Sequence, residues 1–228
     1  MLEKSDLNLV VACSRDAIVM AGGKTGDTQA DFLRIDQVYV SGCVRDGLHI
    51  EPSAAAHWIE DFHISNVRIY NCGRHGICIV QPNLSTTFIN QGLFVNVEVR
   101  GSGQITSNGL EVYCEGQGTV SGQKVSEISW INCEFDAAGA SNHGLSSFYL
   151  TETGSESDFD GWQWIGCTFE DVGDTIVGKT YAIFIAGSTV PSAKIGRTVP
   201  PSAAISPATR SSRALSKSII ATLAPLAA

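Results

Sequence analysis

The sequence lacks the features that would assign it to several common classes. It has no apolar run near the ~20 residues of a membrane-spanning helix, so we expect no membrane segment. It has 15 basic against 23 acidic residues, and the net charge of −8 argues against a nucleic-acid-binding protein. It also has no ten-residue stretch with helical periodicity. These absences leave a β-rich protein as the expectation.

Cysteine pairing and export signals are also missing. The seven cysteines are odd in number, are scattered, and form no CxxC zinc pair. We therefore expect buried free thiols and folding in a reducing compartment. Glu3, Lys4 and Asp6 precede any apolar run, which is wrong for a signal peptide.

The chain divides by charge and composition. All 23 acidic residues lie in residues 1–174, whereas residues 188–228 are basic and rich in Ser, Ala and Pro. We expect one domain over residues 1–187 and a poorly ordered tail or linker over 188–228. Because no helix is expected to cap its first repeat, the domain is interpreted as a fragment of a longer chain.

What the body does contain is a repeat. Five segments share alternating apolar residues, and their central residues are Val38, Val67, Val97, Cys133 and Cys167. Each segment is typical of a strand with one buried face. A second element follows, because Gly47-Leu48-His49-Ile50 aligns with Gly76-Ile77-Cys78-Ile79 and then with Gly109-Leu110-Glu111-Val112. A further copy begins at Gly144-Leu145, and the glycines suggest corners with unusual backbone angles.

Short strands in repeats of 29–36 residues cannot bury their apolar faces alone, so stacked coils are the expected solution. We predict an all-β, right-handed parallel β-helix of about five coils with an irregular C-terminal tail. An antiparallel β-sandwich is the alternative.

The run from Asn66 to Ile79 and its copies resemble the parallel β-helix of the pectin-lyase-like superfamily. Within this superfamily, the general residue pattern of residues 28–50 is most similar to that of phage tailspike and capsule-depolymerase chains. The resemblance implies a homotrimer in a virion tail, made in the bacterial cytoplasm, with a bacterial surface polysaccharide as partner. The polygalacturonase Asp-Asp pair and the pectate-lyase calcium aspartates are absent, so no named mechanism carries over.

The candidate site follows from residues expected to point outward on stacked strands. Glu111 is the first choice for a general acid or base, Glu51 is its partner, and His49 is a base suited to a lyase. The predicted substrate-binding residues are Arg74, His75, Tyr113 and Asp46. An outward polar residue can equally be part of a solvated face.

A second outward column contains Tyr39, Arg68, Glu98, Glu134 and Thr168. Arg68 beside Glu98 predicts an ion pair. Glu98 beside Glu134 favours either a cation such as Ca²⁺ or relief of repulsion within the longer coil. We predict no metal site or cofactor beyond this weak Ca²⁺ signal.

Three functions fit these residues. The first is a polysaccharide-degrading enzyme, a glycoside hydrolase or lyase. The second is a non-catalytic carbohydrate- or receptor-binding β-helix, and the third is a structural segment of a viral fibre. The fold alone supports all three.

Overall fold

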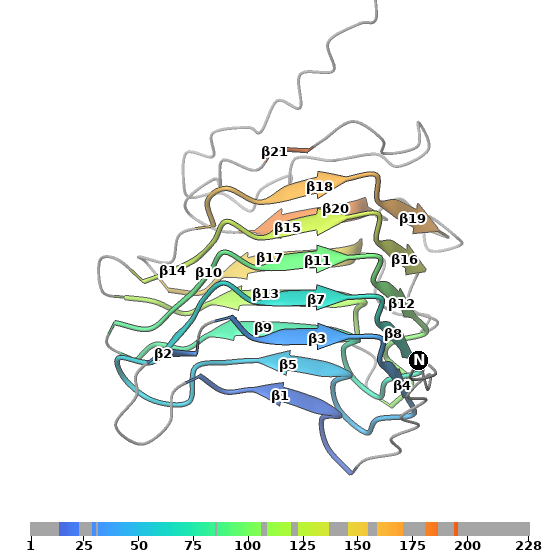
Figure 1. The fold of residues 1–228 in the computed structure, drawn as a ribbon, viewed down its shortest axis with the longest axis horizontal. Coiled ribbons are helices and arrows are strands. Elements are labelled where there is room, and N and C mark those ends of the chain that lie inside the picture. The colour runs from blue at the N-terminus through green and yellow to red at the C-terminus, as the bar shows by residue number, and fades with distance from the viewer. Residues whose placement is uncertain are drawn as a thin grey trace, which may run out of the picture.

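The computed structural model describes residues 14–22, 29–30, 32–84, 86–105, 109–119, 123–136, 146–154, 159–170, 181–186 and 194–195. They form an all-β parallel solenoid of about four coils, where the repeat predicted about five (Figure 1). Every strand pairing among them is parallel, so the antiparallel sandwich is excluded. No helix in these residues is long and apolar enough to cross a membrane.

Each of the first four described coils visits four sheets in turn, here called A, B, C and D. Sheet A contains β1 (Ile18–Met20), β5 (Leu48–Ile50), β9 (Ile77–Gln81), β13 (Val112–Gly116), β17 (Ser146–Glu152) and β20 (Tyr181–Ala186). Sheet B contains β2 (Gln29–Ala30), β6 (Trp58–Ile59), β10 (Phe88–Asn90) and β14 (Lys124–Ser126).

Sheet C contains β3 (Arg34–Asp36), β7 (His63–Ser65), β11 (Leu93–Val95), β15 (Ser129–Ile131), β18 (Gln163–Ile165) and β21 (Lys194–Ile195). Sheet D contains β4 (Tyr39–Ser41), β8 (Arg68–Tyr70), β12 (Glu98–Arg100), β16 (Glu134–Asp136) and β19 (Thr168–Glu170). Strand β21 lies in the predicted tail and pairs with β18. The rest of residues 188–228 lies outside the described residues.

The interior is a set of stacked apolar columns, as the repeat predicted. The central residues of the repeat line the inside, with Val67, Val97 and Cys133 each 1% exposed. In sheet C the inner column changes from Ile64 to aromatic residues, and Trp130 stacks on the Phe94 ring with centroids 3.8 Å apart. All six described cysteines are free and buried, in agreement with the prediction of free thiols.

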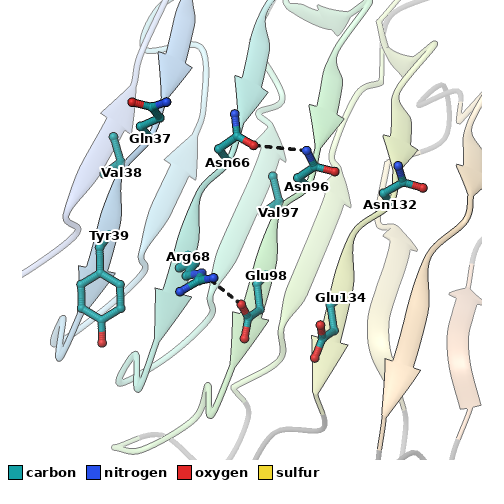
Figure 2. A pocket seen from close by; sticks show the side chains of 10 residues that line it. All are labelled: Gln37, Val38, Tyr39, Asn66, Arg68, Asn96, Val97, Glu98, Asn132 and Glu134. Atoms are coloured by element: carbon teal, nitrogen blue, oxygen red, sulfur yellow. Dashed lines mark hydrogen bonds and ion pairs between the residues drawn. The ribbon is translucent and has the colours of Figure 1, made fainter. Parts of the chain in front are cut away.

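The first repeat segment is a corner and not one continuous strand. The residue before each central position takes positive φ values of 51–65°, and sheet C gives way to sheet D there (Figure 2). The corner residues are Gln37, Asn66, Asn96, Asn132 and Gly166. Asn and Gly tolerate this left-handed conformation best, which explains why amides recur at this position.

Glycine precedes the sheet A strands because space is short there, and not because of the unusual backbone angles that the sequence suggested. Neither Gly47 nor Gly76 has a positive φ. A Cβ at Gly47 would lie 2.2 Å from the Ile69 side chain, and one at Gly76 would lie 2.1 Å from Val99. These glycines therefore provide space between coils, and Gly144 lies outside the described residues.

Candidate functional site on sheet A

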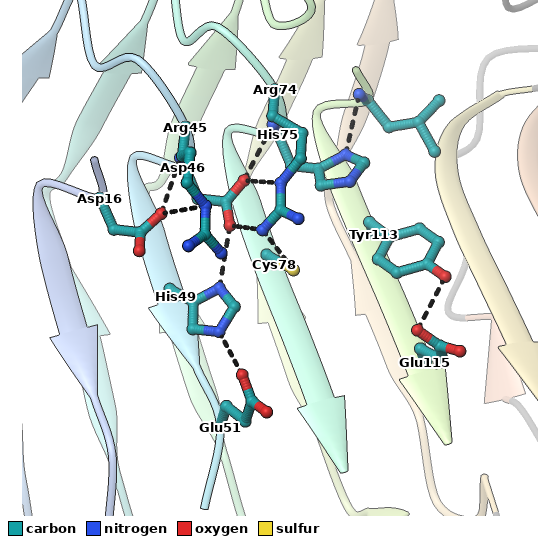
Figure 3. A network of polar contacts seen from close by, with 11 residues as sticks. Asp16, Arg45, Asp46, His49, Glu51, Arg74, His75, Cys78, Tyr113 and Glu115 are labelled. Atoms are coloured by element: carbon teal, nitrogen blue, oxygen red, sulfur yellow. Dashed lines mark hydrogen bonds and ion pairs between the residues drawn. The ribbon is translucent and has the colours of Figure 1, made fainter. Parts of the chain in front are cut away.

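The outer side of sheet A, at its first coils, brings together most of the predicted site residues. Side chains alternate along a strand, so Leu48 and Ile50 enter the core while His49 faces outward. Figure 3 shows the resulting polar cluster around the corner that precedes each strand. The predicted residues found there are Asp46, His49, Glu51, Arg74, His75 and Tyr113.

Asp46 is the centre of this cluster. It is fully buried, and its Oδ1 accepts hydrogen bonds from Arg74 Nε at 2.8 Å and from the His75 backbone N–H at 3.1 Å. Its Oδ2 accepts from a second guanidinium nitrogen of Arg74 and from His49. Burial alone would raise the pKa of Asp46, but the hydrogen bonds from Arg74 and His49 outweigh it and hold the pKa well below 3.8. Asp46 is therefore ionised at neutral pH.

His49 lies between two carboxylates. Its Nδ1 is 2.9 Å from Asp46 Oδ2, and its Nε2 is 2.6 Å from Glu51 Oε2. Burial alone would lower the pKa of His49, but the hydrogen bonds to Asp46 and Glu51 outweigh it and raise the pKa above 6.5. The charged imidazolium donates from both nitrogens, which is the form that two ionised carboxylates favour.

Glu51 connects this buried pair to solvent. Its side chain is 40% exposed, whereas that of His49 is 8% exposed. Glu51 and His49 line a pocket of about 500 Å³ together with Arg15, Asp16 and Arg45. A proton on His49 can pass along the 2.6 Å contact to the Glu51 carboxylate and so reach a ligand. The arrangement is suited to acid–base chemistry beside two guanidinium groups.

Asp16 repeats the structural part of the cluster one coil earlier. Its Oδ1 accepts from the Asp46 backbone N–H at 3.1 Å and lies 3.5 Å from Arg45 Nε. Asp46 makes the same two kinds of contact with His75 and Arg74 in the next coil. The sequence signal is Arg15-Asp16-Ala17-Ile18, which matches Arg45-Asp46-Gly47-Leu48 thirty residues later. It was missed because the first copy identified in the sequence begins at Gly47.

Glu111 does not occupy the predicted outward column. Val112 pairs with Ile77 and Tyr113 with Cys78, so the predicted alignment of Leu110 with Ile77 is wrong by two residues. The connection before β13 is longer than in the preceding coil, so Gly109 does not occupy the position of Gly76. Glu111 is fully buried where the chain enters β13, so the first-choice acid does not face the pocket. Of the predicted catalytic residues, Glu51 and His49 line the pocket.

Tyr113 begins an aromatic row on the outer side of sheet A. Its ring stacks on His75 with centroids 4.7 Å apart and on Tyr149 at 5.9 Å. Its hydroxyl donates to Glu115 Oε2 at 3.1 Å. Burial, then the neighbouring Glu115 carboxylate, raises the pKa of Tyr113, so the phenol stays protonated at neutral pH. Tyr113 is therefore not a base, and neighbouring rings cover both faces of its own ring.

Two groups on this face have the spacing of metal ligands. They are Asp46, His75 and Cys78, and Asp16, Asp46 and His49, with ligand atoms within 4.8 Å of one another in each group. Both groups need Asp46, whose oxygens already accept from Arg74 and His49. The donors are thus committed to hydrogen bonds, and the residues do not fit a resident metal ion.

The Ca²⁺ signal at Glu98 and Glu134 has another explanation. The two residues pair in register, as predicted. Arg100 bridges them, with Nε 2.6 Å from Glu98 and a second nitrogen on Glu134. The predicted ion pair between Arg68 and Glu98 is confirmed at 3.3 Å. A guanidinium group relieves the repulsion that suggested a cation.

Comparisons with protein-family models, with curated proteins and with solved structures gave no match for this chain. The fold defines its class as a parallel β-solenoid. The site must be interpreted from its own residues.

Proposed function

We propose that this solenoid cleaves a polysaccharide by acid–base chemistry at Glu51 and His49. One observation carries the proposal: the Asp–Arg contact recurs from coil to coil, but a histidine between two carboxylates occurs once in the described part of sheet A. The residues paired with His49 in the neighbouring coils are Val19 and Cys78. A contact needed only for folding would not require the added His49 and Glu51.

Each residue has a distinct role in this proposal. Glu51 is the exposed end of the pair, so in hydrolysis it passes a proton from His49 to the glycosidic oxygen as the glycosidic bond breaks. Water then adds to the anomeric carbon and returns its proton through Glu51 to His49, which Asp46 orients through Nδ1. Arg74 keeps Asp46 ionised and is a positioning residue, not a free cation for substrate as the sequence suggested.

The pocket and the aromatic row support a sugar chain as substrate. Arg15 and Arg45 line the pocket and suit an acidic or hydroxyl-rich sugar. The stacked rings of Tyr113 and Tyr149 lie further along the same sheet, and the edges of this row offer an aromatic surface to a sugar chain. A polysaccharide lying along the solenoid axis contacts both features.

The finer family assignment belongs to the same proposal. We propose a phage tailspike type of β-helix, in the pectin-lyase-like superfamily, that acts as a homotrimer on bacterial surface polysaccharide. The repeat and the parallel fold support it. Among the described strands β1 pairs on one side only, and an open strand edge favours assembly that covers it.

The test is incubation with a panel of bacterial capsular and O-antigen polysaccharides. New reducing ends report any chain cleavage, and absorbance of unsaturated sugars reports elimination alone. Glu51→Gln should lower turnover by about 10²–10⁴-fold, the usual contribution of a general acid–base residue. The control is Glu115→Gln, in the same outer column two coils away, which should retain the wild-type rate.

Two results contradict the proposal. One is an absence of products from every polysaccharide in the panel. The other is full activity in Glu51→Gln on a polysaccharide that the wild-type protein cleaves.

A further inference from the structure

A second polar groove runs along the corner between sheets C and D (Figure 2). It has a volume of about 620 Å³, and we call it the corner trough. One side carries the amides of Asn66, Asn96 and Asn132, and the other carries Tyr39, Arg68 and Glu98. None of these residues belongs to the cluster on sheet A.

The amides form a regular array because each occupies the same left-handed corner position. Asn66 Nδ2 donates to Asp36 Oδ1 at 2.8 Å, and Asn96 Nδ2 donates to Asn66 Oδ1 at 3.2 Å. A side-chain amide offers two N–H donors and two acceptor lone pairs. Each contact in this row uses one donor or one lone pair, so further donors and acceptors face the trough from exposed side chains.

The charges on the opposite side are compensated within the protein. Glu98 pairs with Arg68 at 3.3 Å and with Arg100 at 2.6 Å. Arg100 also binds Glu134. A polyanion would therefore meet carboxylates and no uncommitted cation in this network, whereas a neutral hydroxyl-rich ligand would meet matching hydrogen-bonding groups.

The repeat distance favours a chain of sugar units. Neighbouring coils of a parallel sheet lie ~4.8 Å apart, so the amides recur at that spacing. One pyranose ring in an extended chain has a similar length. The half-buried ring of Tyr39 at one end offers an aromatic edge or face beside the row.

We propose that the corner trough is a second, non-catalytic binding site for a neutral oligosaccharide that lies along the solenoid axis. Asn66, Asn96 and Asn132 contact successive sugar units. The site lies on other sheets than the Glu51–His49 pocket and does not require cleavage there. It would hold a long glycan at a distance from that pocket.

The test uses titration calorimetry of the full chain with neutral tetrasaccharides, namely cellotetraose, maltotetraose and N-acetylchitotetraose, and with tetragalacturonate as the acidic comparison. We expect at least one neutral ligand to bind and tetragalacturonate to bind about tenfold more weakly or not at all. The variant combines Asn66→Gly, Asn96→Gly and Asn132→Gly. Glycine keeps the left-handed corner, as Gly166 does in the next coil, and removes the amides.

The matched control removes three side chains from another corner with the same backbone conformation. Asp61, Gln91 and Glu127 lie between sheets B and C with φ of 48–56°. Changing these three residues to glycine should leave binding unchanged, whereas the asparagine variant should bind about tenfold more weakly or worse. The Glu51→Gln variant should bind as the wild type does, which separates this proposal from the proposed cleavage.

Hydroxyl-radical footprinting of the wild-type protein gives a second measurement that needs no variant. Bound ligand should reduce oxidation of Tyr39. The proposal is overturned if no neutral tetrasaccharide binds, if the asparagine variant binds as tightly as the control, or if Tyr39 is not protected. It is also overturned if the asparagine variant changes the oligomeric state by light scattering while glycan binding persists, since the trough would then contact another copy of the chain.

Discussion

Two adjacent coils of sheet A share an aspartate that contacts an arginine and a backbone N–H of the next coil. Only the second coil also has a histidine and a glutamate beside it. In the first coil Asp16 binds Arg45 and the backbone of the next coil. In the second coil Asp46 makes the equivalent contacts. The positions that are Val19 and Ala21 in the first coil are His49 and Glu51 in the second. The comparison separates a contact that joins coils from a group that can do chemistry.

The largest expected difference between the coils is in stability. Asp46→Ala removes a fully buried carboxylate that accepts from Arg74, His49 and the backbone. We expect it to lower the free energy of unfolding by about 3 kcal/mol, at the low end for a broken buried pair because Arg74 is one third exposed. Asp16→Ala should cost about 1–2 kcal/mol, because it breaks fewer contacts. Urea denaturation measures both, and equal losses would contradict the distinction.

The pH dependence of stability is the next way to test the comparison. The pKa of His49 is raised above 6.5, so its contribution is present below pH 6.5 and is lost as pH rises through the folded-state value. The pKa of Asp46 is lowered, so its contribution is present above pH 3.8 and is lost as pH falls through its folded-state value. Urea midpoints should therefore fall from pH 6 to pH 9 in the wild type and fall less in His49→Gln. Parallel profiles for the two proteins would refute the assignment.

A smaller effect comes from transplanting the pair into the first coil. The double change Val19→His and Ala21→Glu places the same residues beside Asp16. Val19 is 56% exposed, so solvent should weaken the new contacts. We expect the pKa of the new histidine to lie above 6.5, with a smaller upward shift than that of His49. The ring-proton NMR signals of the two histidines measure both values. A larger shift than that of His49 would show that burial does not set the difference.

The sequence was sufficient for the fold where the repeat kept a constant length. Val38, Val67 and Val97 identified the stacking, and the offset between Gly47 and Gly76 identified the register of β5 and β9. It failed at Glu111, where the connection between sheets D and A is five residues longer than in the preceding coil while the local motif stayed similar. Apolar residues alternate with polar ones on through Leu110, Val112 and Cys114, so the local pattern alone cannot decide whether Leu110 or Val112 pairs with Ile77.

The candidate site was predictable in part for the same reason. Side-chain alternation placed His49 outward, and the repeat placed Asp46 beside Arg74. The link between His49 and two carboxylates depends on rotamers and burial that the repeat does not encode. The corner trough was not expected, because the positive φ at Asn66 and its equivalents turns what looked like one strand into a concave corner.

NMR titration of His49 in the full chain measures whether Asp46 and Glu51 keep this imidazole charged beside the pocket. We expect a pKa above 6.5 in the wild type and a lower one in both Asp46→Asn and Glu51→Gln. A wild-type pKa at or below 6.5, or one that neither substitution changes, would contradict this expectation.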